Sequence, residues 1–150
     1  MDTATRTQII SIIDEVNDLT LATSRDDGYP QATTVSYVND GLTIYFGAAS
    51  HSQKAHNIAS NNKVSLTINL PYTNWDEIQG VSISGIAELV TDAAEQQKVS
   101  DLLLAKFPQI SEYVPPEMST DELELFRILP KFISLLDYRK SFGHTELFEL

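Results

Sequence analysis

A hydroxyl and an ammonium stand two positions apart at a corner of the chain where the residue types and their spacing could bind a phosphate. Ser52 is a good helix N-cap, and Lys54 follows it in the first helical turn. The start of a helix carries free backbone N–H groups and a partial positive charge, and both favour an anion. The pair therefore indicates a cradle for a phosphorylated ligand. The alternative is an ordinary strand-to-helix connection in which Lys54 is a solvated surface lysine.

The residues around this corner place it between two expected strands. Leu42, Ile44 and Phe46 are apolar at alternating positions, which is the period of a half-buried strand. Four small residues at positions 47–50 then remove bulk from the turn. Residues 63–70 alternate again after the short helix. The corner is thus expected to join two strands through a short helix.

Other kinds of catalytic or metal chemistry lack the residues that they need. The chain has no cysteine, which excludes disulfides, thiolate metal sites and a cysteine nucleophile. His51 and His56 are five residues apart, so on a helix they point in different directions and make a poor metal pair. We therefore expect no metal site, while a single histidine facing haem stays open as an alternative. No Ser-His-Asp arrangement, P-loop or dinucleotide-binding GxGxxG pattern is present, and the sequence identifies no catalytic residue.

Charge and hydropathy exclude several kinds of partner. Ten lysines and arginines stand against 21 aspartates and glutamates, a net charge of −11, and no basic cluster is present. Most of such a surface would repel nucleic acid and anionic membranes. No apolar run is long enough to span a membrane, and acidic residues interrupt the N-terminal segment where a signal peptide needs an apolar stretch. We expect a cytoplasmic protein, which the lack of cysteine also suits.

The pattern of apolar residues predicts helices and an antiparallel meander. Ile9, Ile12, Ile13 and Val16 share one face of an expected helix at residues 4–17. Further elements are expected as strands at residues 19–24, 31–38, 42–46, 63–70 and 81–90, with tight turns at Asp27-Gly28 and residues 39–41. Gly85, inside the last of these strands, indicates a bulge or bend.

The remainder of the chain predicts a second long helix and a last strand. Asp92 is expected to cap a helix over residues 92–107. Pro108, Pro115 and Pro116 then break the chain into an irregular, acidic segment. Residues 123–138 are expected as a strand that is interrupted or bent at Pro130. About six short strands and three helices predict an α+β protein built on a small barrel.

The motifs around the corner resemble those of a known superfamily. In order, they are a strand ending in "AT", a turn with Gly28 and Pro30, a strand, a turn at Gly41, "IYF", Ser52-Gln53-Lys54, Asn57-Ile58 and "NNKVSL". This order, continued by "GVSISGIAEL", resembles the pyridoxamine 5′-phosphate oxidase-like superfamily of FMN-binding split barrels. The resemblance covers roughly two-thirds of the chain. It implies an antiparallel six-stranded split β-barrel with flanking helices, α+β in class, as a single FMN-binding domain over residues 1–150.

The same resemblance implies a cofactor site and a partner. In this superfamily FMN lies at the interface of a homodimer, with its phosphate at the start of the short helix and its ring along neighbouring strands. The chain is accordingly expected to form a homodimer with FMN between the subunits. The implied phosphate residues are Ser52, Gln53 and Lys54; the implied ring and ribityl residues are Thr33, Thr34, Val35 and Ser36, opposite Phe46, Gly47 and Ala48, with Gln79 reaching the ring from the partner subunit.

Two positions depart from the relatives that bind FMN tightly. Those relatives often carry an arginine where this chain has Gln53, and another where it has Thr33. Each missing arginine removes a charge-assisted phosphate contact, typically worth about 1.5–3 kcal/mol. The sequence therefore predicts moderate or weak flavin affinity, carried mainly by Lys54 and the helix start.

The resemblance favours a small FMN-dependent oxidoreductase of unknown substrate. Pyridoxamine 5′-phosphate oxidase itself is not expected, because its arginine- and histidine-rich C-terminal segment has no clear counterpart in residues 136–150. Two alternatives stay open: a non-catalytic, stress-related split barrel that holds flavin, deazaflavin or haem, and a structural dimer with a vestigial cleft.

Trp75 is interpreted as a dimer contact, a lid on the flavin or a packing residue. The tail residues Tyr138, Arg139, Phe142 and His144 would either close the site or stay at the surface.

Overall fold

The computed structural model describes residues 1–114 and 122–150, so the interruptions expected at Pro115 and Pro116 lie outside the described residues. The helices within this part are α1 (Thr3–Glu15), α2 (Gln53–Ser60), α3 (Ala93–Lys106), α4 (Ile110–Tyr113) and a short 3₁₀ helix, η1 (Trp75–Glu77). The strands are β1 (Asp18–Ser24), β2 (Pro30–Ser36), β3 (Val38–Asp40), β4 (Thr43–Ala49), β5 (Lys63–Asn69), β6 (Gln79–Leu89), β7 (Leu123–Asp137) and β8 (Thr145–Glu149).

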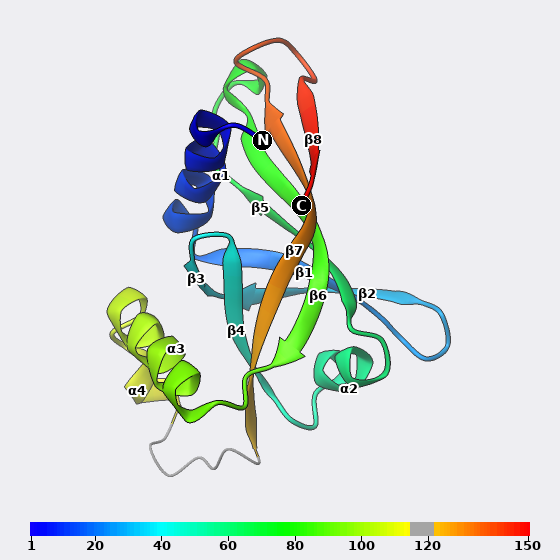
Figure 1. Cartoon of the computed structure of the whole chain (residues 1–150), viewed down its shortest axis with the longest axis vertical. Coiled ribbons are helices and arrows are strands. Elements are labelled where there is room, and N and C mark those ends of the chain that lie inside the picture. Colours follow the sequence, from blue (N-terminus) through cyan, green and yellow to red (C-terminus); the bar gives the residue numbers. More distant parts are fainter. Residues whose placement is uncertain (115–121) are drawn as a thin grey trace.

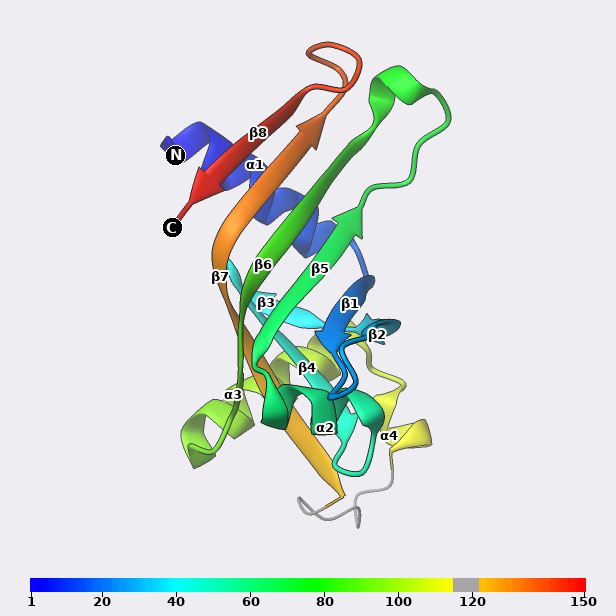
Figure 2. The same ribbon diagram turned by 90° about the vertical axis from the view of Figure 1, so that its right-hand side faces the viewer.

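All of these strands belong to one curled antiparallel sheet. Its order is β2-β1-β5-β6-β7-β4-β3, and β8 also pairs with β7. The long strand β7 pairs with β4 through its first half and with β8 through its second half. Strands β5, β6 and β7 run along the molecule, while β1 and β2 cross them (Figures 1 and 2). The curl brings the edge strand β2 close to β4, and this seam is the split in the barrel.

The predicted α+β class and antiparallel split barrel are confirmed, with two strands more than the six expected. The strand expected at residues 31–38 is divided, because β2 ends at Ser36 and β3 begins at Val38 and pairs with β4. Tyr37, between them, turns into the core and donates its hydroxyl to the carbonyl of Ile13 at 2.6 Å. The added strand β8 has only half-buried side chains on its inner face, so its sequence gives a weak strand pattern.

The core lies between α1 and the concave face of the sheet. Ile9, Ile12 and Ile13 are buried, as the helical period predicts, and pack with the inner residues of β1, β4, β5, β6 and β7. Burial of a branched aliphatic side chain contributes about 1.5–3 kcal/mol, so this face of α1 fixes the helix on the sheet. At its start, Asp2 Oδ1 accepts from the backbone N of Thr5 at 2.8 Å, which caps the helix.

Gly85 forms the predicted bulge. The pairing of β6 with β7 shifts between Ser84 and Gly85, and Gly85 faces Pro130. A Cβ at this position would lie 2.3 Å from the carbonyl oxygen of Leu129. Only glycine allows so close an approach of the two backbones, and the bulge helps the long strands to bend.

Helix α3 covers the lower end of the sheet next to β3 and β4 (Figure 1). The predicted cap is confirmed, because Asp92 Oδ2 accepts from the backbone N of Glu95 at 2.9 Å. At the other end of α3, the Lys106 ammonium donates to the carbonyl oxygens of Val16 and Tyr37, at 2.7 and 3.0 Å. The cap stabilises the start of α3, and the contacts of Lys106 hold its last turn against Val16 and Tyr37. No helix in the described part of the chain is both long and apolar enough to cross a membrane.

Candidate functional site

A cavity of about 540 Å³ lies at the seam where β2 approaches β4. We call it the seam cavity. Its walls come from β2, β4, the start of α2, the start of β7 and the α3–α4 segment; they are formed by Thr34, Val35, Ser36, Gly47, Ala48, Ala49, Lys54, Leu103, Phe107, Gln109, Ile110, Tyr113, Val114, Leu123 and Leu125. The lining is mostly apolar, with three hydroxyls, one side-chain amide and one ammonium. This combination of an apolar body and a few polar groups is typical of small-molecule sites.

Lys54 is the cation of the seam cavity, and its ammonium has no hydrogen bond or ion pair with any described residue. Several other cations are engaged, as Arg25 is with Asp27 at 3.0 Å and Arg139 with Asp137 at 2.9 Å. A half-buried, unpaired lysine creates a local positive potential in a chain whose net charge is −11. The geometry therefore leaves Lys54 able to bind an anion.

Six of the residues implied by the resemblance meet at this cavity. They are Thr34, Val35 and Ser36 from β2, Gly47 and Ala48 from β4, and Lys54 from α2. Gly47 has no side chain, and an added Cβ would lie 3.5–3.6 Å from the side chains of Leu125 and Leu123. The bare backbone at Gly47 therefore leaves room for a flat group against β4.

Two other implied residues of these strands do not line the seam cavity. Thr33 is not part of its wall, although it lies on the same face of β2 as Val35. Phe46 is fully buried and stacks on Phe126, with ring centroids 5.2 Å apart. Phe46 thus supports the wall of the cavity from the core.

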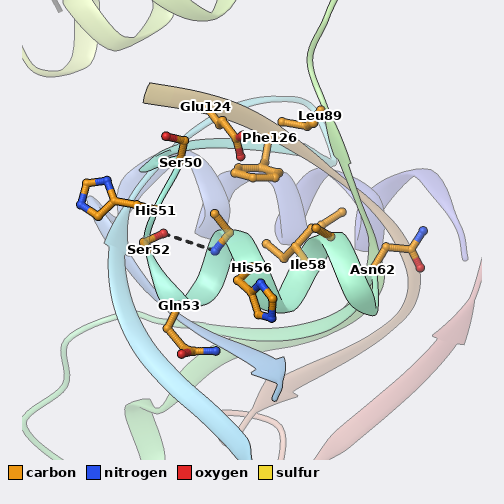
Figure 3. Close-up of a pocket in the computed structure, with 13 residues that line it drawn as sticks. Ser50, His51, Ser52, Gln53, His56, Ile58, Asn62, Leu89, Glu124 and Phe126 are labelled. Carbon is orange, nitrogen blue, oxygen red and sulfur yellow. Dashed lines mark hydrogen bonds between the residues drawn. The ribbon is translucent and has the colours of Figure 1, made fainter. Parts of the chain in front are cut away.

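Ser52 and Gln53 line a second cavity, of about 670 Å³, on another side of α2 (Figure 3). We call it the α2 cavity. Ser52 Oγ accepts from the backbone N of Ala55 at 3.3 Å, which confirms the predicted N-cap. The side-chain amide of Gln53 donates to Asn57 Oδ1 at 2.7 Å. In this arrangement Lys54 serves the seam cavity, while Ser52 and Gln53 face different surroundings.

Asn57 fixes α2 to the sheet and was not identified as a site residue from the sequence. It is fully buried, and its Nδ2 donates to Thr23 Oγ1 at 3.0 Å and to Gln31 Oε1 at 3.2 Å. A fully satisfied buried amide holds one geometry, because a shift of the helix would leave polar groups unpaired. The signal in the sequence was an amide between Ala55 and Ile58 on the apolar face of a short helix. Through this network the sheet determines where α2 places Lys54.

The α3–α4 segment forms one wall of the seam cavity, which the sequence did not predict. Leu103 lies in the last turn of α3, Phe107 follows the helix as its C-cap, and Ile110 and Tyr113 belong to α4. Helix α3 is anchored from the sheet, where Arg127 pairs with both Glu88 and Glu95. The contacts that fix this wall are far apart in sequence, so the periodicity of residues 92–107 alone could not reveal it.

Gln79, Trp75 and the tail residues lie at the opposite end of the molecule from α2 and α4 (Figure 2). There the rings of Trp75 and Phe142 stack with centroids 5.9 Å apart, and Tyr138 meets Phe142 edge to face at 5.5 Å. We call Trp75, Tyr138 and Phe142 the aromatic tip. None of these described residues lines the seam cavity of its own chain.

Several solved structures share this fold. A haem-binding protein from Mycobacterium smegmatis superposes with a TM-score of 0.79 and 18% identity, over 99% of this chain and 58% of that protein. The haem storage protein of Vibrio cholerae gives 0.69 and 18%, over 95% and 92% of the two chains. General stress protein 26 from Bacillus anthracis gives 0.74 and 18%, over 99% and 100%. This chain thus spans only 58% of the mycobacterial protein, and at these identities the likeness concerns the fold.

The family is shown by the sequence comparison. No protein with a curated description matches the sequence. A family model described as pyridoxamine 5′-phosphate oxidase matches residues 6–131, which include the curled sheet up to the middle of β7, both cavities and the α3–α4 wall. The chain therefore belongs to the pyridoxamine 5′-phosphate oxidase family of split barrels.

Proposed function

We propose that this protein binds FMN in the seam cavity and acts as a small flavin-dependent oxidoreductase. The observation that carries the proposal is the unpaired ammonium of Lys54 in a cavity that also contains Thr34, Ser36 and the bare backbone of Gly47. Family membership supports a flavin as the ligand. A homodimer that places the cofactor between subunits is part of the proposal, as is a cytoplasmic location, which the lack of cysteine suits.

The residues present fit a flavin in their chemistry. Lys54 supplies charge for a phosphate, and the hydroxyls of Thr34 and Ser36 supply hydrogen bonds for a polar chain. Gly47 and Ala48 allow a flat ring to approach β4. The volume of about 540 Å³ lies within the range of small-molecule sites. The cavity thus offers a charged end and an apolar body, in the arrangement that a phosphorylated flat molecule needs.

The protein's own contribution would be binding, orientation and exclusion of water. A bound flavin supplies hydride or electron transfer. Phe107, Ile110 and Tyr113 line the seam cavity on the α3–α4 side, where they would limit the access of water to a bound flavin. Lys54 and Tyr113 are the titratable side chains among the described lining residues. Neither is positioned by a hydrogen-bond partner, so the proposal includes no acid–base step by the protein.

Haem binding without turnover is the second candidate function. Two proteins with the same fold are described as haem-binding and haem storage proteins. In this chain His51 is exposed, lines the α2 cavity and has no partner among the described residues, so its imidazole could coordinate an iron. If the protein binds haem, its affinity would depend on His51 and not on Lys54.

A spectroscopic titration separates the two candidates. Adding FMN to the purified protein is expected to shift the flavin absorption spectrum and to quench flavin fluorescence. Lys54→Ala is expected to raise the Kd for FMN at least about tenfold, the effect of losing a charge-assisted contact of about 1.5 kcal/mol. Lys63→Ala is the matched control, because Lys63 is an exposed lysine without an ion pair on the strand after α2, and it should leave the Kd unchanged.

Other outcomes would reject the proposal in distinct ways. An unchanged Kd for Lys54→Ala would mean that the phosphate of FMN does not bind beside Lys54 in the seam cavity. A Soret band that appears on adding haemin and is lost in His51→Ala would favour the second candidate. If millimolar FMN causes no spectral change, the flavin proposal is wrong. If flavin binds but is not reduced by a nicotinamide donor, the protein would be a flavin-binding protein and not an oxidoreductase.

A further inference from the structure

The α2 cavity contains a carboxylate that the proposed flavin site does not use. Glu124, near the start of β7, is half-buried and has no hydrogen bond or ion pair with any described residue. Figure 3 shows its carboxylate directed from β7 toward α2, beside the ring of Phe126. The group therefore faces the open space of the cavity.

The floor of the α2 cavity is apolar. It is formed by Ile58 of α2, Ala87 and Leu89 of β6, and Phe126 of β7. Phe126 is held in place by its stacking on Phe46, at 5.2 Å between centroids. An apolar surface next to a carboxylate suits a molecule with an apolar body and one charged end.

Two acids near this region have partners: Asp26 meets His56 at 2.9 Å, and Glu88 meets Arg127 at 3.2 Å. Glu122 is exposed and does not line the cavity. Among the described residues that line the α2 cavity, Glu124 is the one acid, and it has no partner. A carboxylate that is partly removed from water is stabilised by a nearby cation. Glu124 therefore has no cationic partner among the described residues, and a bound cation would stabilise its charge.

The kind of cation follows from the rest of the lining. No group of three or more histidine, aspartate or glutamate side chains in the described residues is arranged to hold a metal ion, so a bare metal would find Glu124 as a single ligand. The net charge of −11 attracts organic cations toward the surface and repels anions. An ammonium on an apolar body satisfies both the carboxylate and the floor.

We propose that the α2 cavity is a binding site for a small organic ammonium, with its charged group at Glu124 and its apolar body on Phe126, Ile58 and Leu89. This ligand is opposite in charge to the flavin phosphate. The α2 cavity shares no lining residue with the seam cavity, which contains Lys54. The two sites lie on different sides of α2 and can be occupied independently. The inference therefore does not depend on the flavin proposal.

Benzylamine is a suitable probe, with benzyl alcohol as its neutral counterpart of the same shape. In an NMR titration of isotopically labelled protein, benzylamine is expected to shift the amide signals of α2 and of residues 124–126. Glu124→Gln, which keeps the size and removes the charge, is expected to weaken binding about three- to fivefold, the effect of one partly exposed ion pair. Glu122→Gln makes the same charge change at an exposed position outside the cavity, and it should leave affinity within about twofold.

The titration also defines the results that would overturn the proposal. Benzyl alcohol should bind about three- to fivefold more weakly than benzylamine, and equal affinity would mean that Glu124 does not recognise the charge. Equal weakening by both glutamine variants would indicate a general charge effect. No signal shift in α2 at tens of millimolar benzylamine, or shifts confined to another surface, would reject the site. Saturation with FMN beforehand should not change the benzylamine affinity.

Discussion

Asp137 shows how much of one end of the molecule depends on a single residue. Its buried carboxylate accepts from Arg139 Nε and Nη2 and from Gln8 Nε2, each at 2.9 Å. The Arg139 guanidinium is the main cause that holds the pKa of this carboxyl well below its usual range, and the bond from Gln8 acts in the same direction. Because Gln8 belongs to α1, Asp137 joins this helix to the end of β7.

Asp137→Asn is expected to lower the free energy of unfolding by about 2 kcal/mol at neutral pH. The substitution keeps the shape of the side chain but removes the charge from three hydrogen bonds, and charge-assisted bonds contribute about 1.5–3 kcal/mol. Chemical denaturation measures the change. Asp76→Asn is the control, because Asp76 is exposed and has no partner among the described residues; a loss of equal size there would contradict the role given to Asp137.

The same variant has an expected pH dependence. Since the pKa of Asp137 is lowered by folding, its contribution is fully present above the pKa of an unfolded aspartate, about 3.9. It is lost progressively as the pH falls below that value toward the pKa of the folded state. The difference in stability between wild type and Asp137→Asn should therefore be constant from about pH 7 to 5 and shrink below about pH 4. A difference that persists undiminished at about pH 2.5 would count against the charge as its cause.

At the scale of the elements, the bulge between β6 and β7 is the point at which the long strands depend on one small residue. Gly85→Ala would place a Cβ 2.3 Å from the carbonyl oxygen of Leu129. The obstacle is backbone, which cannot rotate away, so we expect a loss near the upper end of overpacking costs, about 3 kcal/mol. For a chain of this size that corresponds to a fall in Tm of roughly 6–12 °C.

Gly47→Ala is the matched control for this prediction. It makes the same change in a strand of the same sheet, but its Cβ would make only ordinary van der Waals contacts, at 3.5 Å and beyond. Thermal unfolding should show little change for Gly47→Ala and a clear fall for Gly85→Ala. Equal Tm values for the two variants would mean that the bulge can shift to accept a side chain.

The elements also show which parts of the fold could be predicted from sequence. Gly85, Asp92 and Ser52 act within a few residues of themselves, and their predicted roles as bulge and caps are confirmed. It was harder to predict which cavity each residue at the start of α2 faces, because Ser52 and Lys54 are close in sequence yet line different cavities. Helix geometry separates the two directions, and the buried contacts of Asn57 with β1 and β2 set which cavity each direction faces. Such contacts connect distant segments, so no local pattern contains them.

At the scale of the whole molecule, the proposed flavin site and the aromatic tip lie at opposite ends. The seam cavity is beside α2 and α4, while η1 and the turn between β7 and β8 form the far end of the long strands (Figure 2). Trp75 is 66% exposed and Phe142 is 74% exposed, although they stack on each other. Exposed stacked aromatics are typical of interaction surfaces. Within one chain the tip cannot cover the cavity, so a role for Trp75 or Gln79 at the flavin requires a second copy.

A test of the proposed homodimer follows from this separation. If the aromatic tip contributes to the interface, Trp75→Ala combined with Phe142→Ala should raise the dimer dissociation constant at least about thirtyfold, the effect of losing about 2 kcal/mol at an interface hot spot. Sedimentation equilibrium over a concentration series measures this constant.

Tyr29→Ala is the control, because Tyr29 is an aromatic of similar exposure, 71%, in the turn between β1 and β2. A monomer at all concentrations would reject the dimer, whereas an unchanged dimer would place its interface elsewhere. If FMN binds between subunits, its affinity should fall together with dimerisation in the double variant and remain normal in the control.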